Sequence, residues 1–357
     1  MGRAIADLKP PRRAENARRG PRQVRATCLT TRGQAIADLK VRATCLTARG
    51  QSIAGLKVGA TCLTCVFLLL LAPIPAHAWG FDAHKTIAEQ FIALLPPDLK
   101  PLFVQRKAYI IERSVDPDLW RTVGWGAEPP NHFLDFDFYG TFPFAELPHE
   151  YDRAVQKFGE SVVREQGTLP WRTQEFYGNL EREFRSLTRR SGNAYALDNI
   201  VLFAAILAHY VSDGHVPLHA VVNYDGQKTN QLGLHSRWES ELFERNRARI
   251  KIAPSPPTAI TDPREFMFQT LLVSSQLAEG VLQSDAKAAQ GREFYDEGYF
   301  DALATEQLSV LERRLNDSVT AVAGMVIGAW EHAGRPPVPI ERPARAPRPI
   351  RPPGQER

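Results

Sequence analysis

The sequence predicts an all-α protein. Apolar residues recur at helical spacing through most of residues 79–334, and no segment shows the alternation of apolar and polar residues that is typical of a half-buried strand. Clusters of proline or glycine separate the helical segments, as expected of loops. The length of this region favours one domain with one hydrophobic core over two domains.

The first predicted helix follows Asp82, a residue type that is preferred at helix N-caps. Apolar residues then lie at helical spacing from Ile87 to Leu95, and Pro96 ends the pattern. Six further helices are predicted, at residues 150–165, 171–188, 197–214, 234–250, 263–289 and 300–332. The clearest predicted loops are the proline-rich or glycine-containing connectors at residues 128–130, 223–226 and 253–257.

Residues 1–57 contain most of a tandem repeat. The hexapeptide Arg-Ala-Thr-Cys-Leu-Thr starts at Arg25 and again at Arg42, and a copy that begins with glycine starts at Gly59, at the same 17-residue spacing. A repeat of this length is too short for a solenoid unit. It is either a small helical array or, as the favoured interpretation, a repeated DNA tract translated from an upstream start codon, for which no fold is expected.

Residues 58–78 have the composition of a signal peptide. The apolar run at residues 65–72 precedes Pro73 and Pro75, and Ala76-His-Ala78 then has the small-x-small form of a signal-peptidase site. A membrane anchor is the less favoured alternative, because the run is well short of the roughly 20 apolar residues that a spanning helix needs. We therefore expect export, and a secreted or periplasmic mature protein that begins at Trp79.

Cysteines and charges also divide the chain at this point. All four cysteines precede Trp79, so the mature protein is expected to form no disulfide. Residues 1–78 hold 13 of the 44 Lys and Arg but only 3 of the 40 Asp and Glu, which leaves residues 79–334 acidic. An acidic region is a poor general nucleic-acid surface, although bound metal would offset part of its charge. Residues 335–357 combine eight prolines with six arginines and are expected to be disordered.

The most informative motif spans residues 207–219. His209 and Asp213 are four residues apart in a largely apolar predicted helix, so they share one face of it. Burial of two polar side chains side by side is costly unless something binds them. Pro217 then ends the helix and allows His219 to turn back toward the same centre.

A second pair with the same spacing, His235 and Glu239, follows on the next predicted helix. A single pair of this kind is more often a hydrogen-bonded couple on the surface. Two such pairs together with His219, within 31 residues, favour a metal centre instead. The mixture of imidazole and carboxylate ligands suits zinc.

These motifs resemble the superfamily of zinc-dependent phospholipase C and the single-strand-specific nucleases of fungi and plants. Members of that superfamily share one helical fold with a cluster of three zinc ions, and their mature N-terminal tryptophan binds zinc through its amino nitrogen and carbonyl oxygen. The cleavage predicted before Trp79-Gly-Phe-Asp-Ala-His84 matches this feature. The resemblance covers about residues 79–244 and implies a multi-helix bundle with a trinuclear zinc site.

The resemblance also implies which residues bind each of the three zinc ions. The first ion would be bound by Trp79, His84 and Asp213; the second by Asp118, His132, His209 and Asp213, with Asp213 as the bridge; and the third by His219, His235 and Glu239.

Three further assignments accompany this ligand set. Asp116 is the alternative to Asp118, which is preferred because the aspartate of the family lies 14 or 15 residues before the next histidine ligand. Phe133 and Asp135 are candidates for substrate binding. His215 lies within the motif but off its ligand face, so it is expected in the outer shell of the site or at the surface.

The resemblance implies a hydrolase of phosphodiester bonds that uses a metal-bound hydroxide, with Asp118 orienting it. Phospholipase C-like activity is preferred, because Glu239 stands where the nucleases usually carry aspartate and because only a short interval separates His219 from His235. A single-strand nuclease is the alternative, since the step from Trp79 to His84 and the sequence at 215–219 are close to nuclease patterns.

Further expectations concern catalysis and partners. A secreted protein that binds zinc for stability alone is the third interpretation. The substrate would be a phospholipid headgroup or single-stranded nucleic acid, and we expect a monomer without a stable protein partner.

Overall fold

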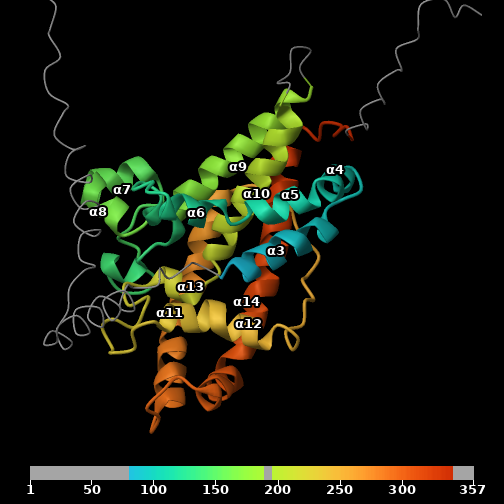
Figure 1. The fold of residues 1–357 in the computed structure, drawn as a ribbon. Helices are drawn as coiled ribbons and strands as arrows, with labels where there is room; N and C mark the ends of the chain where they lie inside the picture. The colour runs from blue at the N-terminus through green and yellow to red at the C-terminus, as the bar shows by residue number, and fades with distance from the viewer. Residues whose placement is uncertain (1–79, 189–194, 341–357) are drawn as a thin grey trace, which may run out of the picture. The chain divides into compact units, whose positions relative to one another are not determined.

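The computed structural model describes residues 80–188 and 195–340, and every regular element in these two ranges is helical. The all-α prediction is therefore confirmed for them. The repeat, the signal peptide, Trp79 and residues 341–357 of the predicted disordered tail lie outside the described residues. The elements, with the labels of Figure 1, are α3 (Phe81–Leu94), α4 (Lys100–Gln105), α5 (Lys107–Arg113), α6 (Asp116–Thr122), η1 (Pro129–His132), η2 (Phe136–Tyr139), α7 (Tyr151–Phe158), α8 (Glu160–Glu165), α9 (Leu169–Ser186), α10 (Ala196–Asp213), η3 (Pro217–Ala220), α11 (Leu234–Ser236), η4 (Arg237–Glu241), α12 (Leu242–Asn246), α13 (Pro263–Ala289) and α14 (Glu297–His332).

Helix α10 is the centre of the fold. It packs against α9, α14, α5 and α3, and Figure 1 shows it among these helices. Every residue from Ala204 to Asp213 is buried, so both apolar and polar side chains of this stretch lie inside the protein. By length and composition α10 could cross a membrane, but 72% of it is buried within the protein, as expected of a core helix.

The predicted long helices are observed with small changes in their bounds, and α13 coincides with the predicted segment 263–289. The segment predicted as one helix at 150–165 is two helices, because Gly159 has a φ of 87° and interrupts it. The helix predicted at 234–250 ends at Asn246 and contains a π-helical segment, η4.

One prediction in the first part of the chain is wrong, and three short helices were not predicted. Asp82 is not the N-cap of α3: Gly80 occupies that position without a side-chain hydrogen bond, and Asp82 lies in the first turn. There its negative charge interacts favourably with the helix dipole. The helices α4, α5 and α6 have no counterpart among the predicted elements, because each has at most seven residues and too few turns for a periodic pattern.

The chain turns back sharply after α10. Pro217 opens η3, a turn of 3₁₀ helix that packs on α13. The carbonyl of His219 accepts a hydrogen bond of 2.9 Å from the Leu134 amide, which ties this turn to the segment after His132. The fold thereby returns His219 to the end of the helix that carries His209 and Asp213.

Candidate metal centre

Three groups of buried side chains among the described residues could hold metal ions. Within each group the potential ligand atoms lie within 4.8 Å of one another. The groups are His84, Asp118 and His209; His132, His209 and Asp213; and His219, His235 and Glu239. Their residues come from α3, α6, η1, α10, η3, α11 and η4, so segments from across the chain meet at this centre.

Asp213 connects the first two groups through its two carboxylate oxygens. Its Oδ1 lies 3.4 Å from His84 Nε2, while its Oδ2 lies 3.0 Å from His132 Nδ1 and 3.3 Å from His209 Nε2. Burial alone would raise the pKa of Asp213, but the surrounding imidazoles hold it well below its ordinary value. A carboxylate with one oxygen toward each group has the geometry of a bridging ligand.

Hydrogen bonds on the outer side of two imidazoles orient them toward the centre. The Nδ1 of His209 lies 2.8 Å from the carbonyl oxygen of Ser114, so Nδ1 carries the proton and donates it. The Ser212 hydroxyl donates to backbone carbonyls and therefore accepts from His84 Nδ1, at 2.9 Å. In both rings Nε2 is left unprotonated, as a metal ligand requires.

The third group surrounds the π-helical segment. His235 Nε2 lies 2.9 Å from His219 Nε2 and 2.9 Å from Glu239 Oε2. Burial raises the pKa of Glu239 to about 8 and lowers the pKa of His235 to about 4. Without a cation these side chains are favoured in their neutral forms, which reflects the cost of burying charge at this site.

The carboxylates of Asp118 and Glu239 provide the clearest test of whether a metal ion fits. Both are fully buried, and neither Asp118 Oδ2 nor Glu239 Oε1 has a hydrogen-bond partner. Buried polar atoms of this kind are rare in folded proteins, and a bound cation would satisfy them. The mixture of carboxylate and imidazole donors also suits a divalent metal. The residues present therefore fit a metal centre.

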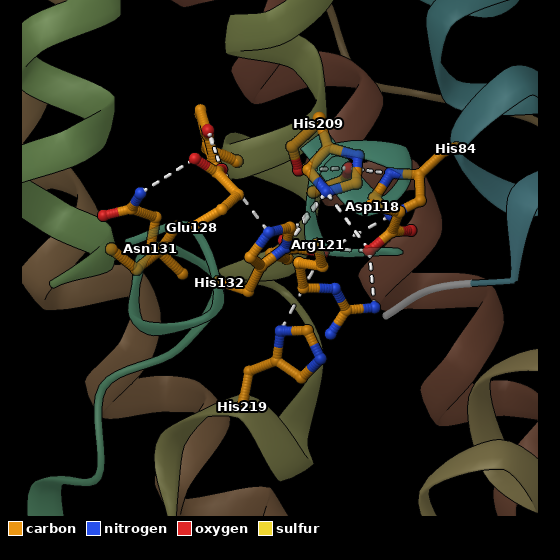
Figure 2. Close-up of polar contacts among 12 residues, drawn as sticks. His84, Asp118, Arg121, Glu128, Asn131, His132, His209 and His219 are labelled. Atoms are coloured by element: carbon orange, nitrogen blue, oxygen red, sulfur yellow. Dashed lines mark hydrogen bonds and ion pairs between the residues drawn. The ribbon is translucent and has the colours of Figure 1, made fainter. Parts of the chain in front are cut away.

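A cavity of about 320 Å³ opens beside the second and third groups. It is lined by the ligand candidates His132, His219 and His235, together with Arg121, Pro129, Phe133, Leu218 and Tyr224. Arg121 places its Nη2 at 2.8 Å from Asp118 Oδ1, and Figure 2 shows its guanidinium group between Asp118 and His219. A cation in the wall of such a cavity attracts an anionic ligand.

The structure separates the two aspartates that the sequence left as alternatives. Asp118 is in the first group, whereas Asp116 is paired with Arg113 through a contact of 3.1 Å between Asp116 Oδ2 and Arg113 Nη1. Both aspartates have an arginine partner, so it is the position of Asp118 close to His84 and His209 that separates them.

The other predicted site residues lie at different distances from the cavity. Phe133 lines it, whereas Asp135 is buried and is not among its lining residues. His215 is buried rather than exposed, and its Nδ1 donates to the carbonyl oxygen of Val211 at 2.8 Å. Trp79 lies outside the described residues, but its neighbour Gly80 is buried against Ser240, the residue after Glu239.

Three residues of the site have no counterpart among the candidates from the sequence: Arg121, Ser212 and Glu128. Arg121 follows Asp118 by three residues, a spacing that places both on one side of a helix. The sequence would therefore have paired them if a helix had been predicted at this segment. Ser212 is hydrogen-bonded to His84, and Glu128 lies 3.6 Å from His132; neither belongs to a motif of its own. No protein-family model matches the chain, and no curated protein matches it.

Proposed function

We propose that this chain is a zinc-dependent hydrolase of phosphodiester bonds, with phospholipase C-like activity as the first candidate. The observation that carries the proposal is a set of three groups of buried His, Asp and Glu side chains, two of which contribute histidines to the wall of one cavity that also contains Arg121. The carboxylate oxygens of Asp118 and Glu239 without hydrogen-bond partners support bound cations rather than a polar core.

Zinc as the metal, and three as the number of ions, are parts of this proposal. The ligands would be those of the three groups, with Asp213 shared and the amino terminus of Trp79 completing the site of His84. Zinc in such a site supplies Lewis acidity toward phosphoryl oxygens and activates water near neutral pH. Because the amino group of Trp79 becomes a ligand only after cleavage, the proposal includes export and processing before Trp79.

Two residues of the chain would bind the substrate phosphate and orient the attacking water. Arg121 lines the cavity and can donate hydrogen bonds to the phosphate oxygens of a substrate. Asp118 lies beside it, with Oδ2 free of hydrogen bonds, and would accept one from the attacking water. The cavity of about 320 Å³ suits a phosphodiester with one small flanking group.

A single-strand nuclease is the second candidate, and two aromatic side chains support it. Phe133 and Tyr224 line the cavity, and Tyr224 remains 45% exposed, so a base could stack on either ring. The same rings can surround the headgroup of a phospholipid. The acidic composition of residues 79–334 is the reason for keeping the phospholipase first, since it opposes general binding of nucleic acid.

The deciding experiment uses the exported protein, purified after processing, with its metal content measured. It is offered a phosphatidylcholine analogue in one reaction and single-stranded DNA in another. Release of phosphocholine with intact DNA would support the phospholipase, and cleavage of the DNA would support the nuclease. If neither substrate is cleaved by protein with a full metal content, the proposed hydrolase activity is wrong. A variant with one extra residue before Trp79 should lose activity, and full activity would contradict the terminal ligand.

Arg121→Met tests the proposed role of the cavity wall. We expect kcat/KM to fall by about 100-fold while the metal content stays unchanged, because a charged donor to the phosphate is lost. Arg113→Met is the matched control, since Arg113 forms a similar pair with Asp116 but does not line the cavity. Equal activity of the two variants would exclude Arg121 from catalysis.

A further inference from the structure

Glu128 is a buried carboxylate behind one of the candidate ligands. It lies four residues before His132 and is only 3% exposed. Its Oε1 is 3.6 Å from His132 Nε2, while the other ring nitrogen, Nδ1, lies 3.0 Å from Asp213 Oδ2. Figure 2 shows Glu128 and Asp118 on opposite sides of the His132 ring. His132 thus has the metal centre on one side and Glu128 on the other.

The outer partner of His132 differs from those of the two neighbouring imidazoles. His84 donates to a hydroxyl group and His209 to a backbone carbonyl, and both acceptors are neutral. His132 faces a carboxylate, while its Nε2 is buried and has no hydrogen bond at the present separation. A carboxylate is the stronger acceptor for an imidazole N–H, and it makes the ring a better electron donor at its other nitrogen.

We infer that Glu128 is a positioning residue of the metal centre, which accepts the Nε2 proton of His132 when Nδ1 binds metal. A neutral imidazole carries one proton, so an acceptor at Nε2 selects the tautomer with its lone pair on Nδ1, toward Asp213. The inference rests on the proposed metal centre and not on the proposed reaction.

Three side chains hold the Glu128 carboxylate in place. The hydroxyl of Tyr210 donates to Oε1, Asn131 Nδ2 donates to Oε2 at 3.1 Å, and Arg172 Nη2 approaches Oε2 at 3.4 Å. Tyr210 follows His209 directly in α10, so the support of Glu128 comes from the same helix as two of the candidate ligands. A carboxylate with contacts at both oxygens is well suited to orient a ring.

Glu128→Gln tests this role with little change in volume. We expect zinc affinity at the group of His132, measured by competition with a chromophoric chelator, to fall by about 10- to 100-fold, which is typical when an outer partner of a metal ligand is replaced. Glu175→Gln is the matched control, because Glu175 binds the same Arg172, at 2.8 Å, but is exposed and does not contact His132. Unchanged affinity in folded Glu128→Gln would overturn the inference.

A second measurement on the wild-type protein does not depend on how the variant folds. With ¹⁵N-labelled, zinc-loaded protein, we expect a slowly exchanging, downfield N–H proton on Nε2 of His132. A proton on Nδ1 instead would overturn the inference, because Nδ1 could not then be the ligand. Absence of zinc binding by the wild-type protein would mean that the proposed metal centre itself is wrong. Zinc binding with the proton on Nδ1 would overturn the role of Glu128 alone, so the two failures can be distinguished.

Discussion

The Oδ1 atom of Asp213 lies 3.4 Å from Nε2 of His84, which joins the end of α10 to the first turns of α3 within a buried site. The other oxygen of this carboxylate faces two further imidazoles. One carboxylate therefore faces imidazoles of the first and the second candidate metal group.

Asp213→Ala is expected to lose metal at both of these groups. The measurement is the number of zinc ions per chain by elemental analysis after dialysis, and the loss should exceed that of His235→Ala, which alters the third group alone. The physical reason is that one carboxylate supplies a ligand atom to each group. Equal losses in the two variants would contradict a bridging Asp213.

Gly80→Ala is expected to lower the free energy of unfolding by about 1–3 kcal/mol. A Cβ atom at residue 80 would lie 2.7 Å from Ser240 Oγ and 3.0 Å from Ser240 Cβ, so either the Ser240 side chain or the chain before α3 must shift. Alanine is also a poorer N-cap than glycine, so Gly80→Ala alone would lose stability even without a close contact. The double variant Gly80→Ala, Ser240→Ala separates the two causes, because removal of the Ser240 hydroxyl should restore the part of the loss that comes from the contact. Gly126→Ala is the control, because nothing lies within 4 Å of its Cβ. Absence of rescue would contradict the close approach.

Asp135→Asn is expected to stabilise the protein more at pH 7.5 than at pH 5. Burial, reinforced by Asp137, raises the pKa of Asp135 from 3.8 to about 7. Between pH 3.8 and about pH 7 the unfolded chain has released the Asp135 proton while the folded protein keeps it, so the free energy of unfolding falls as pH rises. Above pH 7 the folded protein carries the full cost of burying the ionised carboxylate.

In urea unfolding, the free energy of unfolding of Asp135→Asn minus that of the wild type should increase by about 2 kcal/mol between pH 5 and pH 7.5. Asp152→Asn, at an exposed position of α7, is the control and should show no such change. A pH-independent effect of Asp135→Asn would show that the carboxyl group does not titrate as described.

Arg237→Met is expected to lower the free energy of unfolding by about 3–5 kcal/mol, because it leaves the buried carboxylate of Asp285 without its cation. Arg237 Nη2 lies 2.9 Å from Asp285 Oδ1, and both side chains are at most 5% exposed. The guanidinium group also donates to the carbonyl oxygens of Gln231 and Leu232, just before His235. Chemical denaturation measures the loss. Arg245→Met removes an exposed pair with Glu297 and should cost less than about 1 kcal/mol.

Some of the site could be read from spacing alone. His209 and Asp213, like His235 and Glu239, are four residues apart, and helical periodicity places each pair on one face regardless of the rest of the fold. The structure brings the atoms of each pair to within 3.3 Å and 2.9 Å. The long amphipathic helices were predictable for the same reason, since their pattern repeats over many turns.

Other contacts had no local signal. Ser212 lies beside Asp213 in sequence, yet its hydroxyl accepts from His84, 128 residues earlier. Glu128 lies four residues before His132, but the prolines between them predicted a loop, so helical spacing gave no reason to pair them; they face each other because the chain closes into η1. Asp116 and Asp118 are separated in role by the orientation of α6, a helix too short to predict.

The sequence by itself determined the helical class, the long helices and the residue types that suit a metal centre, because periodicity and ligand chemistry are properties of a local segment. Only the tertiary structure decided which carboxylate faces which imidazole, where Arg121 and the cavity lie, and that Glu128 stands behind His132. Those relationships depend on how α3, α6, η1 and α10 pack together. Distances between segments far apart in the chain are set by that packing and not by the periodicity of any one of them.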